Sequence, residues 1–517
     1  MVFTLALGLA GLAGFLAISL EILWYRAFSF ASGQAAVTGP LLAAASLAGF
    51  AEGAWYARSI ARRYLRTNQT ARRAAACFAI GAGVGVIVIP ALARITELSD
   101  WAWALPLVGV ACAGFGASLT LLAHLSIDPN QRAGELLSRF CAATIAGSAM
   151  ATLITGLVLT QEMQTATLAR GIVMLGAAAA VTIATPATRG RDRLAWIGTL
   201  SAAALVVIAA SPSLHESIYE RMLYRDRYRG ERFEDLVENR HGVIGVAPDR
   251  HIVENGVDGG PVAMDVDDRQ SLLVRAFAIP ALSAAPARVL VIGLGTGAWP
   301  QIVAGLPSVK GVTIIDASPE QVDLVSRSVE GAPLMRSSKV RVVVDDPRGW
   351  LERHPDETFD VIISHAALSW RAHASRLRSV EFMRLARAHL STGGLLYFNT
   401  DNAPSAFRSA FDVFPHGLRF LDFAAVSMAP VAFDEARWRR ALANYRLNGV
   451  APFDTTTSRG RARVASFLAT PHDIAGWFGS STLESRGSML PRLRDVSPIT
   501  DDNMGGEWRV GMRTGTW

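Results

Sequence analysis

The chain is poor in charged residues and in cysteine. Charged residues make up 18% of its 517 residues, below the roughly 25% of an ordinary soluble protein, whereas 51% are hydrophobic. This composition excludes a disordered chain and a simple cytosolic globule. The cysteines lie in apolar runs, which excludes a disulfide scaffold and a zinc ribbon and indicates small buried side chains at Cys77, Cys112 and Cys141.

Several kinds of binding protein are also excluded. The net charge is +6, but no motif of a nucleic-acid module accompanies it, so we expect no nucleic-acid partner. No repeat has the period of a solenoid. The histidines are scattered, and no cluster of histidine, cysteine and aspartate has the spacing of metal ligands, so we expect no metal site.

Long apolar runs fill the chain up to about residue 210. A run of about 20 apolar residues crosses a bilayer core of ~30 Å as a helix. The first run has no basic segment before it and no small-residue cleavage site after it, so we interpret it as an uncleaved span. Small residues such as Gly81, Gly83 and Gly85 favour close helix packing. We predict seven spans, at about 2–22, 36–57, 74–93, 101–123, 140–160, 168–185 and 194–210.

Arginines are distributed unevenly between the loops of this half. The loops 58–73, 128–139 and 186–193 hold 11 arginines, whereas the alternate loops hold only Arg26 and Arg94. The positive-inside rule predicts that the first set faces the cytoplasm. Seven spans would then place the rest of the chain outside. Because the segment after the last run is also basic, either one run does not cross or the following domain is exported.

Three ionisable residues, Glu21, Glu52 and His124, fall within or at the edge of apolar runs. Ionisable groups are costly in lipid and usually have a partner or a function. One interpretation is a proton or amine path through the bundle. The other is a residue that reaches the interface or is neutral and hydrogen-bonded.

The second half reads as a water-soluble α/β domain. Residues 231–262 are strand-rich, and from residue 287 strands alternate with helices, which predicts a doubly wound, mostly parallel sheet. The expected fold is a multi-pass α-helical membrane bundle fused to a Rossmann-like α/β domain with a small β domain before it. The predicted strands are Arg288–Ile292, Val312–Ile315, Lys339–Val344, Phe359–Ser364 and Leu395–Asn399.

A candidate nucleoside site follows from the ends of these strands. The first strand leads into Gly293, Gly295, Thr296 and Gly297, a glycine-rich turn that lets a ligand approach the backbone. Two aspartates follow at later strand ends. Asp316 is placed to accept hydrogen bonds from ribose hydroxyls, and Asp346 from an adenine amino group. A dinucleotide site is the alternative, but the third glycine of its fingerprint is missing, and Trp299-Pro300 follows here instead.

At these motifs residues 231–400 resemble the spermidine synthase (polyamine aminopropyltransferase) family. The membrane half is similar to membrane-fused bacterial homologues. The resemblance implies a methyltransferase-like Rossmann core that binds S-adenosylmethionine, its decarboxylated form or methylthioadenosine. It is carried by Glu254-Asn255-Gly256, Val289–Gly297, Val312–Glu320, Val342–Asp346, Phe359–Ile363, Ser19–Arg26 and Thr500-Asp501-Asp502.

The chain departs from the family where the family binds and deprotonates an amine. An acid of the family's glycine loop is replaced by Thr296. The loop after the fourth strand, usually Asp-Ser-Ser-Asp, reads His365-Ala366-Ala367-Leu368. A Tyr-His-Glu stretch that helps to hold the polyamine corresponds to Leu272-Leu273-Val274. The nucleoside motifs are thus retained, while the amine-binding acids are mostly lost.

Three residues are candidates to replace the lost acids. His365 can accept a proton near pH 7 as a neutral imidazole, or it can be a loop histidine without a chemical role. Asp501 and Asp502 can supply carboxylates from the C-terminal segment, or they can begin a turn. The basic segment around His373 can hold an anionic acceptor or form a solvated face.

Three functions remain open at this level. The first is a membrane-anchored transferase that moves an aminopropyl-type group to an amine or other small acceptor; the second moves a methyl group. The third is a catalytically silent nucleoside-binding module coupled to the bundle or to a partner protein. The resemblance also implies a homo-oligomer with contacts at 231–262. We expect a multi-pass protein of the bacterial inner membrane with segments at 1–210 (bundle), 211–285 (linker and β domain), 286–430 (Rossmann-like) and 431–517 (C-terminal extension).

Overall fold

The computed structural model describes nearly the whole chain as two compact units. The first unit consists of residues 1–245 and 254–257, and the second of residues 246–253 and those from 258 onward. The predicted four-part division stays a prediction. The described residues are 1–64, 68–128, 130, 132–262, 264–267, 273–365, 371–447, 449–473 and 481–507.

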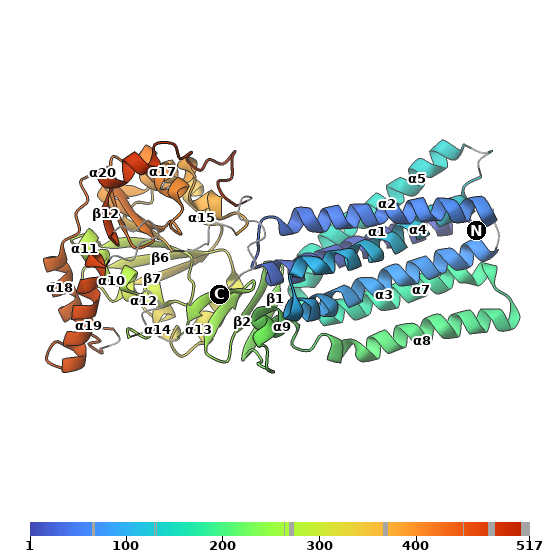
Figure 1. Cartoon of the computed structure of the whole chain (residues 1–517), viewed down its shortest axis with the longest axis horizontal. Helices are drawn as coiled ribbons and strands as arrows, with labels where there is room; N and C mark the ends of the chain where they lie inside the picture. The colour runs from blue at the N-terminus through green and yellow to red at the C-terminus, as the bar shows by residue number, and fades with distance from the viewer. Residues whose placement is uncertain are drawn as a thin grey trace. The chain divides into compact units, whose positions relative to one another are not determined.

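Long helices run alongside one another in the first unit (Figure 1). They extend beyond the predicted apolar runs, because backbone hydrogen bonding continues through polar residues at the helix ends. A π-helical segment, η2 (Ile154–Leu159), and a short helix, α6 (Thr160–Glu162), prolong α5. The long helices are α1 (Phe3–Ser32), α2 (Thr38–Tyr64), α3 (Asn68–Leu98), α4 (Leu105–Ser126), α5 (Ala133–Leu153), α7 (Thr165–Ala184) and α8 (Gly190–Leu214).

Among the described residues, six of these helical stretches are long and apolar enough to cross a membrane. The prediction of seven spans is therefore corrected by one. The exception is α2, in which Glu52 and several weakly apolar residues lower the hydropathy of the run. It is still a helix of 27 residues.

Glycines bring pairs of these helices into backbone contact. A side chain at Gly49 of α2 would collide with the backbone of Gly109 of α4, and one at Gly53 with Ala113. The same relation joins Gly147 of α5 to α1. Small residues four apart on facing helices allow such close approach. Membrane helices associate through this close packing because no hydrophobic effect drives them together within lipid.

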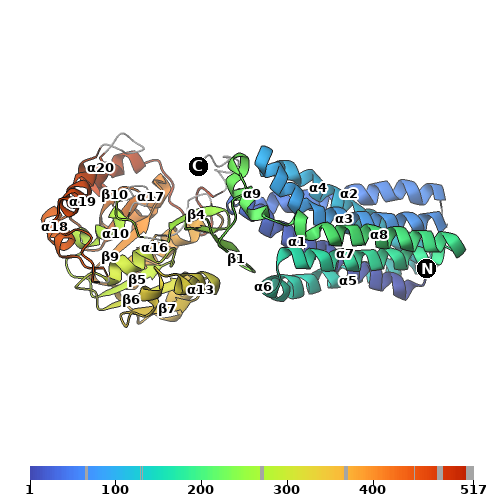
Figure 2. The same ribbon diagram turned by 90° about the horizontal axis from the view of Figure 1, so that it is seen from below.

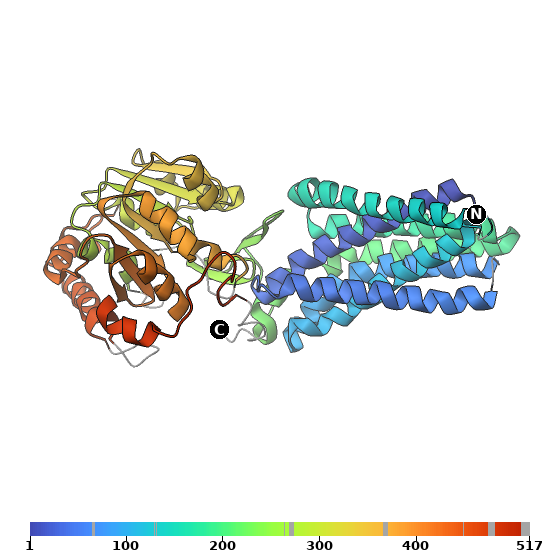
Figure 3. The same cartoon turned by 90° about the horizontal axis from the view of Figure 1, so that it is seen from above.

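Different ion pairs lie at the two ends of the helix bundle. Near the N-terminus, α3 and α8 begin side by side, and Arg72 Nη2 lies 3.1 Å from Asp192 Oδ2 (Figures 1 and 3). At the opposite end, Arg221 of α9 (Ile218–Tyr224) pairs with Glu97 of α3. The chain therefore leaves the bundle at the end opposite to its arginine-rich loops.

A small four-stranded sheet precedes the main sheet. Its four strands lie in sequence order, and contain the two stretches at 243–246 and 251–253 that the sequence indicated. Short turns connect them, with Asn255 and Gly256 in left-handed conformations at the third turn. The strands are β1 (Asp235–Asn239), β2 (Gly242–Val246), β3 (His251–Glu254) and β4 (Val257–Pro261).

The second unit is built on an eight-stranded sheet with the order β12-β10-β11-β9-β8-β5-β6-β7 (Figure 2). β5 to β9 are parallel, whereas β11 is antiparallel to both β9 and β10. The Rossmann-like, methyltransferase-type α/β fold is thus confirmed. The strands are β5 (Arg288–Ile292), β6 (Gly311–Asp316), β7 (Val340–Val344), β8 (Phe359–Ser364), β9 (Leu390–Asn399), β10 (His416–Phe420), β11 (Phe423–Ser427) and β12 (Leu483–Ser485).

Alternate side chains of β5 face the two sides of this sheet. Leu290 and Ile292 join a buried core with Trp350, Phe382 and Phe407. That core packs under α15 (Pro347–Arg353), α16 (Val380–Ala388) and α17 (Pro404–Val413). The other helices of the unit are α10 (Val274–Phe277), α11 (Ile279–Leu282), α12 (Ala298–Ala304), α13 (Pro319–Arg327), α14 (Ala332–Met335), α18 (Glu435–Asn444), α19 (Ser458–Ala469) and α20 (Arg486–Met489).

Candidate functional site

The candidate site lies where the central parallel strands end. Ile292, the last residue of β5, pairs with Ile315 of β6 on one side and with Ser364 of β8 on the other. The chain order reverses at β5, because its neighbours β6 and β8 come later along the chain on opposite sides. In α/β sheets this switch point, at the carboxyl ends of the strands, is where ligands bind.

The turn after β5 requires its glycines. Gly293, Gly295 and Gly297 have φ angles of 88°, 56° and 84°, in the left-handed region that favours glycine. A side-chain carbon at Gly295 would also lie 2.9 Å from Cε1 of His365. Thr296 is half-buried between these glycines, and its Oγ1 accepts a long hydrogen bond of 3.4 Å from the Ala298 amide.

Asp316 ties this turn to the end of β6. Its Oδ2 accepts a hydrogen bond of 2.7 Å from the Leu294 amide, and its Oδ1 accepts one of 2.9 Å from the Ser318 amide. Gln321 of α13 donates to the Gly295 carbonyl over 2.6 Å. The structure thus brings the predicted loop and the predicted aspartate together.

Asp346 lies at the end of β7, as the sequence indicated, and begins α15. Its Oδ2 accepts a hydrogen bond of 2.8 Å from the Gly349 amide, which caps this helix, and lies 3.7 Å from Nη2 of Arg376. The neighbouring Asp345 accepts from Arg353, which lowers the pKa of its carboxyl. Asp346 is exposed, so its other oxygen is open to a further donor.

His365 follows β8 and lies against the glycine turn. Its Nε2 is 2.8 Å from the Gly293 carbonyl oxygen, which only accepts, so Nε2 carries the hydrogen and Nδ1 the lone pair. Burial lowers the pKa of His365 to about 4, and the nearby Arg275 contributes in the same direction. The imidazole is therefore neutral at pH 7 but a weak base.

The two predicted acids of the C-terminal segment, Asp501 and Asp502, have different surroundings. Arg348 of α15 donates two hydrogen bonds to Asp501, of 2.8 and 2.7 Å, and this pairing lowers the pKa of the Asp501 carboxyl. Asp501 therefore lies beside the helix that Asp346 caps. Asp502 is exposed in the following turn. Their catalytic role, like that of His365, stays a prediction.

The sequence analysis missed an aromatic group beside His365. Trp299 stacks between His365 and Phe423, with ring centroids 5.4 and 5.1 Å away, and Tyr397 packs against Phe423 at 4.8 Å. Arg275 lies over the Phe423 ring and pairs with Asp422 over 2.6 Å. These residues come from segments that lie far apart in the sequence. The only sign of this aromatic group in the sequence was therefore Trp299 itself, in place of a small residue.

Parts of the predicted amine-binding region lie outside the described residues. These are Leu272 and the segment 366–370, which includes Leu368. Leu273 and Val274 are described; Leu273 precedes α10 and Val274 is buried at its start. The apolar character of these two residues agrees with the loss of polar partners for an amine.

The fold and these strand ends define a methyltransferase-type Rossmann domain, and comparison with known proteins agrees. A family described as "Methyltransferase domain" matches residues 289–394. A polyamine aminopropyltransferase of Mycobacterium tuberculosis is 26% identical over 303 residues, which cover 56% of this chain and 55% of that protein. Polyamine aminopropyltransferase 2 of Streptomyces coelicolor is 28% identical over 232 residues, covering 42% and 40%.

The chain thus spans about half the length of the curated relatives that it matches. A solved structure of a probable spermidine synthase from Corynebacterium glutamicum matches 53% of this chain and 96% of that one, with 18% identity and a TM-score of 0.34. The resemblance to the spermidine synthase family that the motifs carry is confirmed.

Proposed function

We propose that the α/β unit binds an adenosyl sulfonium, either S-adenosylmethionine or its decarboxylated form, or the thioether product methylthioadenosine. The observation that carries this is the carboxylate of Asp316, held at the strand end by two backbone amides beside the glycine-rich turn. A carboxylate at this position can accept hydrogen bonds from the two vicinal hydroxyls of a ribose. Asp346 supplies a second acceptor, at the end of the neighbouring strand.

We further propose an aminopropyl-type transfer to a small amine, as the names of the relatives suggest. The amine nitrogen attacks the carbon next to the sulfonium. The carbon–sulfur bond breaks and its electron pair stays on sulfur, which releases methylthioadenosine, while the new ammonium loses a proton to a base or to water. With His365 held at a low pKa, catalysis rests mainly on positioning the two reactants.

A second candidate is a nucleoside-binding module without turnover, and two observations favour it. His365 donates its hydrogen to Gly293 and is a weak base, and Asp501 is neutralised by two hydrogen bonds from Arg348. Neither group is free in this arrangement to anchor or deprotonate an amine. A methyl transfer, which needs no diamine site, is a separate, enzymatic candidate.

Anchoring in the bacterial inner membrane is part of the proposal. Six helical stretches of the described chain have the length and hydropathy of spans. Their contacts with each other through glycines suit a lipid bilayer.

Binding measurements separate these candidates. Calorimetry of the detergent-solubilised full chain with S-adenosylmethionine, decarboxylated S-adenosylmethionine and methylthioadenosine identifies the ligand, and release of methylthioadenosine reports turnover with an amine. We expect Asp316→Ala to weaken binding by at least about 100-fold, because two hydrogen bonds to a charged group are lost.

The matched control is Asp323→Ala, which removes an exposed carboxylate of α13 paired only with Arg327 in the same helix. It should bind as the wild type does. Unchanged affinity of Asp316→Ala would overturn the site. Binding without turnover would instead select the silent module.

A further inference from the structure

A small cavity of about 90 Å³ lies within the first unit, separate from the nucleoside site. Most of its lining comes from the second half of α1, the π-helical segment η2 with Thr160, and the hairpin between β1 and β2, and Gln34 and Asn255 complete it. The motif Ser19–Arg26, which the nucleoside site does not use, contributes Ile22, Tyr25 and Arg26. Irregular π segments inside helices often mark functional sites.

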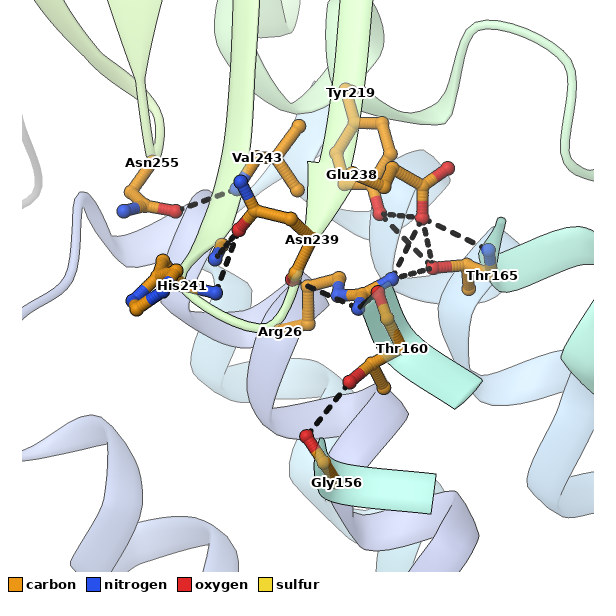
Figure 4. A network of polar contacts seen from close by, with 11 residues as sticks. Arg26, Gly156, Thr160, Thr165, Tyr219, Glu238, Asn239, His241, Val243 and Asn255 are labelled. Atoms are coloured by element: carbon orange, nitrogen blue, oxygen red, sulfur yellow. Dashed lines mark hydrogen bonds and ion pairs between the residues drawn. The ribbon is translucent and has the colours of Figure 1, made fainter. Parts of the chain in front are cut away.

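One wall of the cavity is a buried, fully bonded arginine (Figure 4). Arg26 is 6% exposed, and its Nη1 lies 3.1 Å from Oε2 of Glu238. Its Nη2 donates to the carbonyls of Thr160 and Asn239, each over 2.9 Å. Glu238 in turn accepts from Thr165 and from the Tyr219 hydroxyl. The network neutralises the arginine and fixes the strand end of β1 against α1.

Two other polar groups that line the cavity have no such partner. Ser29 is 7% exposed and Asn239 is 1% exposed, yet Ser29 Oγ and Asn239 Nδ2 make no hydrogen bond within the described chain. A buried amide or hydroxyl without a partner costs about 1–3 kcal/mol. The other end of the Asn239 side chain is used, since Oδ1 accepts from the His241 and Gly242 amides over 2.6 and 2.9 Å.

The groups around the cavity are therefore rich in hydrogen-bond donors. Asn239 Nδ2 has two hydrogens to donate. Arg240 Nε donates to His241 Nε2 over 3.1 Å, so the remaining ring nitrogen of His241 carries its hydrogen. Arg240 and His241 are exposed, which leaves the cavity accessible from their side. Arg26 already neutralises the charge of Glu238. The charge of Arg240 therefore makes the surroundings of the cavity positive overall.

We propose that this cavity binds an oxyanion group, a carboxylate or a phosphate, through Asn239 Nδ2 and Ser29 Oγ. The cavity volume of about 90 Å³ is large enough to hold one such group. The group belongs either to a small free anion or to the head of an anionic lipid. This proposal does not depend on the proposed transferase.

The test uses thermal unfolding of the full chain. In detergent, acetate and inorganic phosphate are compared with sodium chloride at equal ionic strength; in lipid nanodiscs, phosphatidylglycerol is compared with phosphatidylcholine. We expect stabilisation of the wild type by one of the two sources. Asn239→Asp keeps the acceptor for the hairpin amides but replaces the two donor hydrogens by a negative charge, so the affinity should fall at least tenfold.

Ser29→Ala should weaken the same effect several-fold while the protein stays folded. Ser32→Ala is its matched control, because the Ser32 hydroxyl already bonds to Thr38 and to the Ser29 carbonyl. Protection by free anions, lost in Asn239→Asp, identifies a soluble ligand; protection only by phosphatidylglycerol, lost in the same variant, identifies a lipid. Absence of protection from both sources, or full protection of Asn239→Asp, would show that only water fills the cavity and would overturn the proposal.

Discussion

At the scale of single residues, the carboxylate of Asp316 and the imidazole of His365 hold the glycine turn from two sides. Asp316 accepts from the Leu294 amide and His365 donates to the Gly293 carbonyl. The turn is therefore fixed before any ligand arrives, which lowers the entropy cost of binding. The same bonds bring His365 into a buried, stacked position, where the charged form is disfavoured.

His365 should make stability depend on pH. Its pKa is about 4 in the folded chain and near 6.5 in the unfolded chain, so between these values only the unfolded chain binds the proton. Its contribution is fully present above pH 6.5 and is lost as the pH falls to 4, by up to about 3 kcal/mol. His365→Gln, which keeps a donor for Gly293, should flatten this part of the stability profile.

Unfolding of the detergent-solubilised wild type and of His365→Gln between pH 4 and pH 8 measures the effect. The difference between the two proteins should change below pH 6.5 and stay constant above it. A constant difference over the whole range would mean that His365 titrates normally, and this outcome would strengthen its candidacy as a base.

At the scale of elements, the helix pairs of the bundle depend on positions where no side chain fits. Gly53 of α2 faces the backbone of Ala113, whereas Gly83 of α3 has no neighbouring atom within 4 Å of an added carbon. Both glycines lie inside helices, where alanine is intrinsically favoured by roughly 0.5–1 kcal/mol. At Gly83, helix propensity favours alanine and packing leaves room for it. At Gly53, helix propensity favours alanine but packing opposes it.

We expect Gly53→Ala to lower stability by about 1–3 kcal/mol, because the added methyl group forces α2 and α4 apart. Gly83→Ala serves as the matched control and should leave stability unchanged or raise it by up to about 1 kcal/mol. Thermal unfolding in the same detergent compares the two. Equal effects of both substitutions would contradict the close packing of α2 on α4.

At the scale of the whole molecule, the arrangement of the bundle sets which side of a membrane each end faces. The arginine-rich connections follow α2, α4 and α7 at one end of the bundle. The chain leaves the bundle after α8 at the opposite end. The positive-inside rule assigns the arginine-rich end to the cytoplasm. A transferase that uses an adenosyl sulfonium needs its α/β unit in the cytoplasm, where this donor is made.

Reporter fusions address both points. Reporters are inserted at the α2–α3 connection and fused after the α/β unit, and reports from opposite sides of the membrane would mean that α2 crosses together with the six other helical stretches. Reports from the same side would mean that α2 does not cross. An α/β unit outside the cytoplasm would exclude the transferase and favour the nucleoside-binding module.

The sequence by itself determined the elements whose signals are local. Strands β5 and β8 begin and end where the apolar runs do, and Asp316 stands at the end of its strand as predicted, because a buried parallel strand must be continuously apolar. The spans were predicted for the same reason, and the run 36–57 does form a helix, α2, although its hydropathy is too low for it to count as a span.

Only the tertiary structure decided the contacts between distant segments. The stack of His365, Trp299 and Phe423, the pairing of Arg348 with Asp501, and the cavity beside Asn239 each join residues that lie far apart in the chain. Such contacts, and the burial that lowers the pKa of His365, arise from how surfaces pack, and packing is a property of the folded chain rather than of any local pattern.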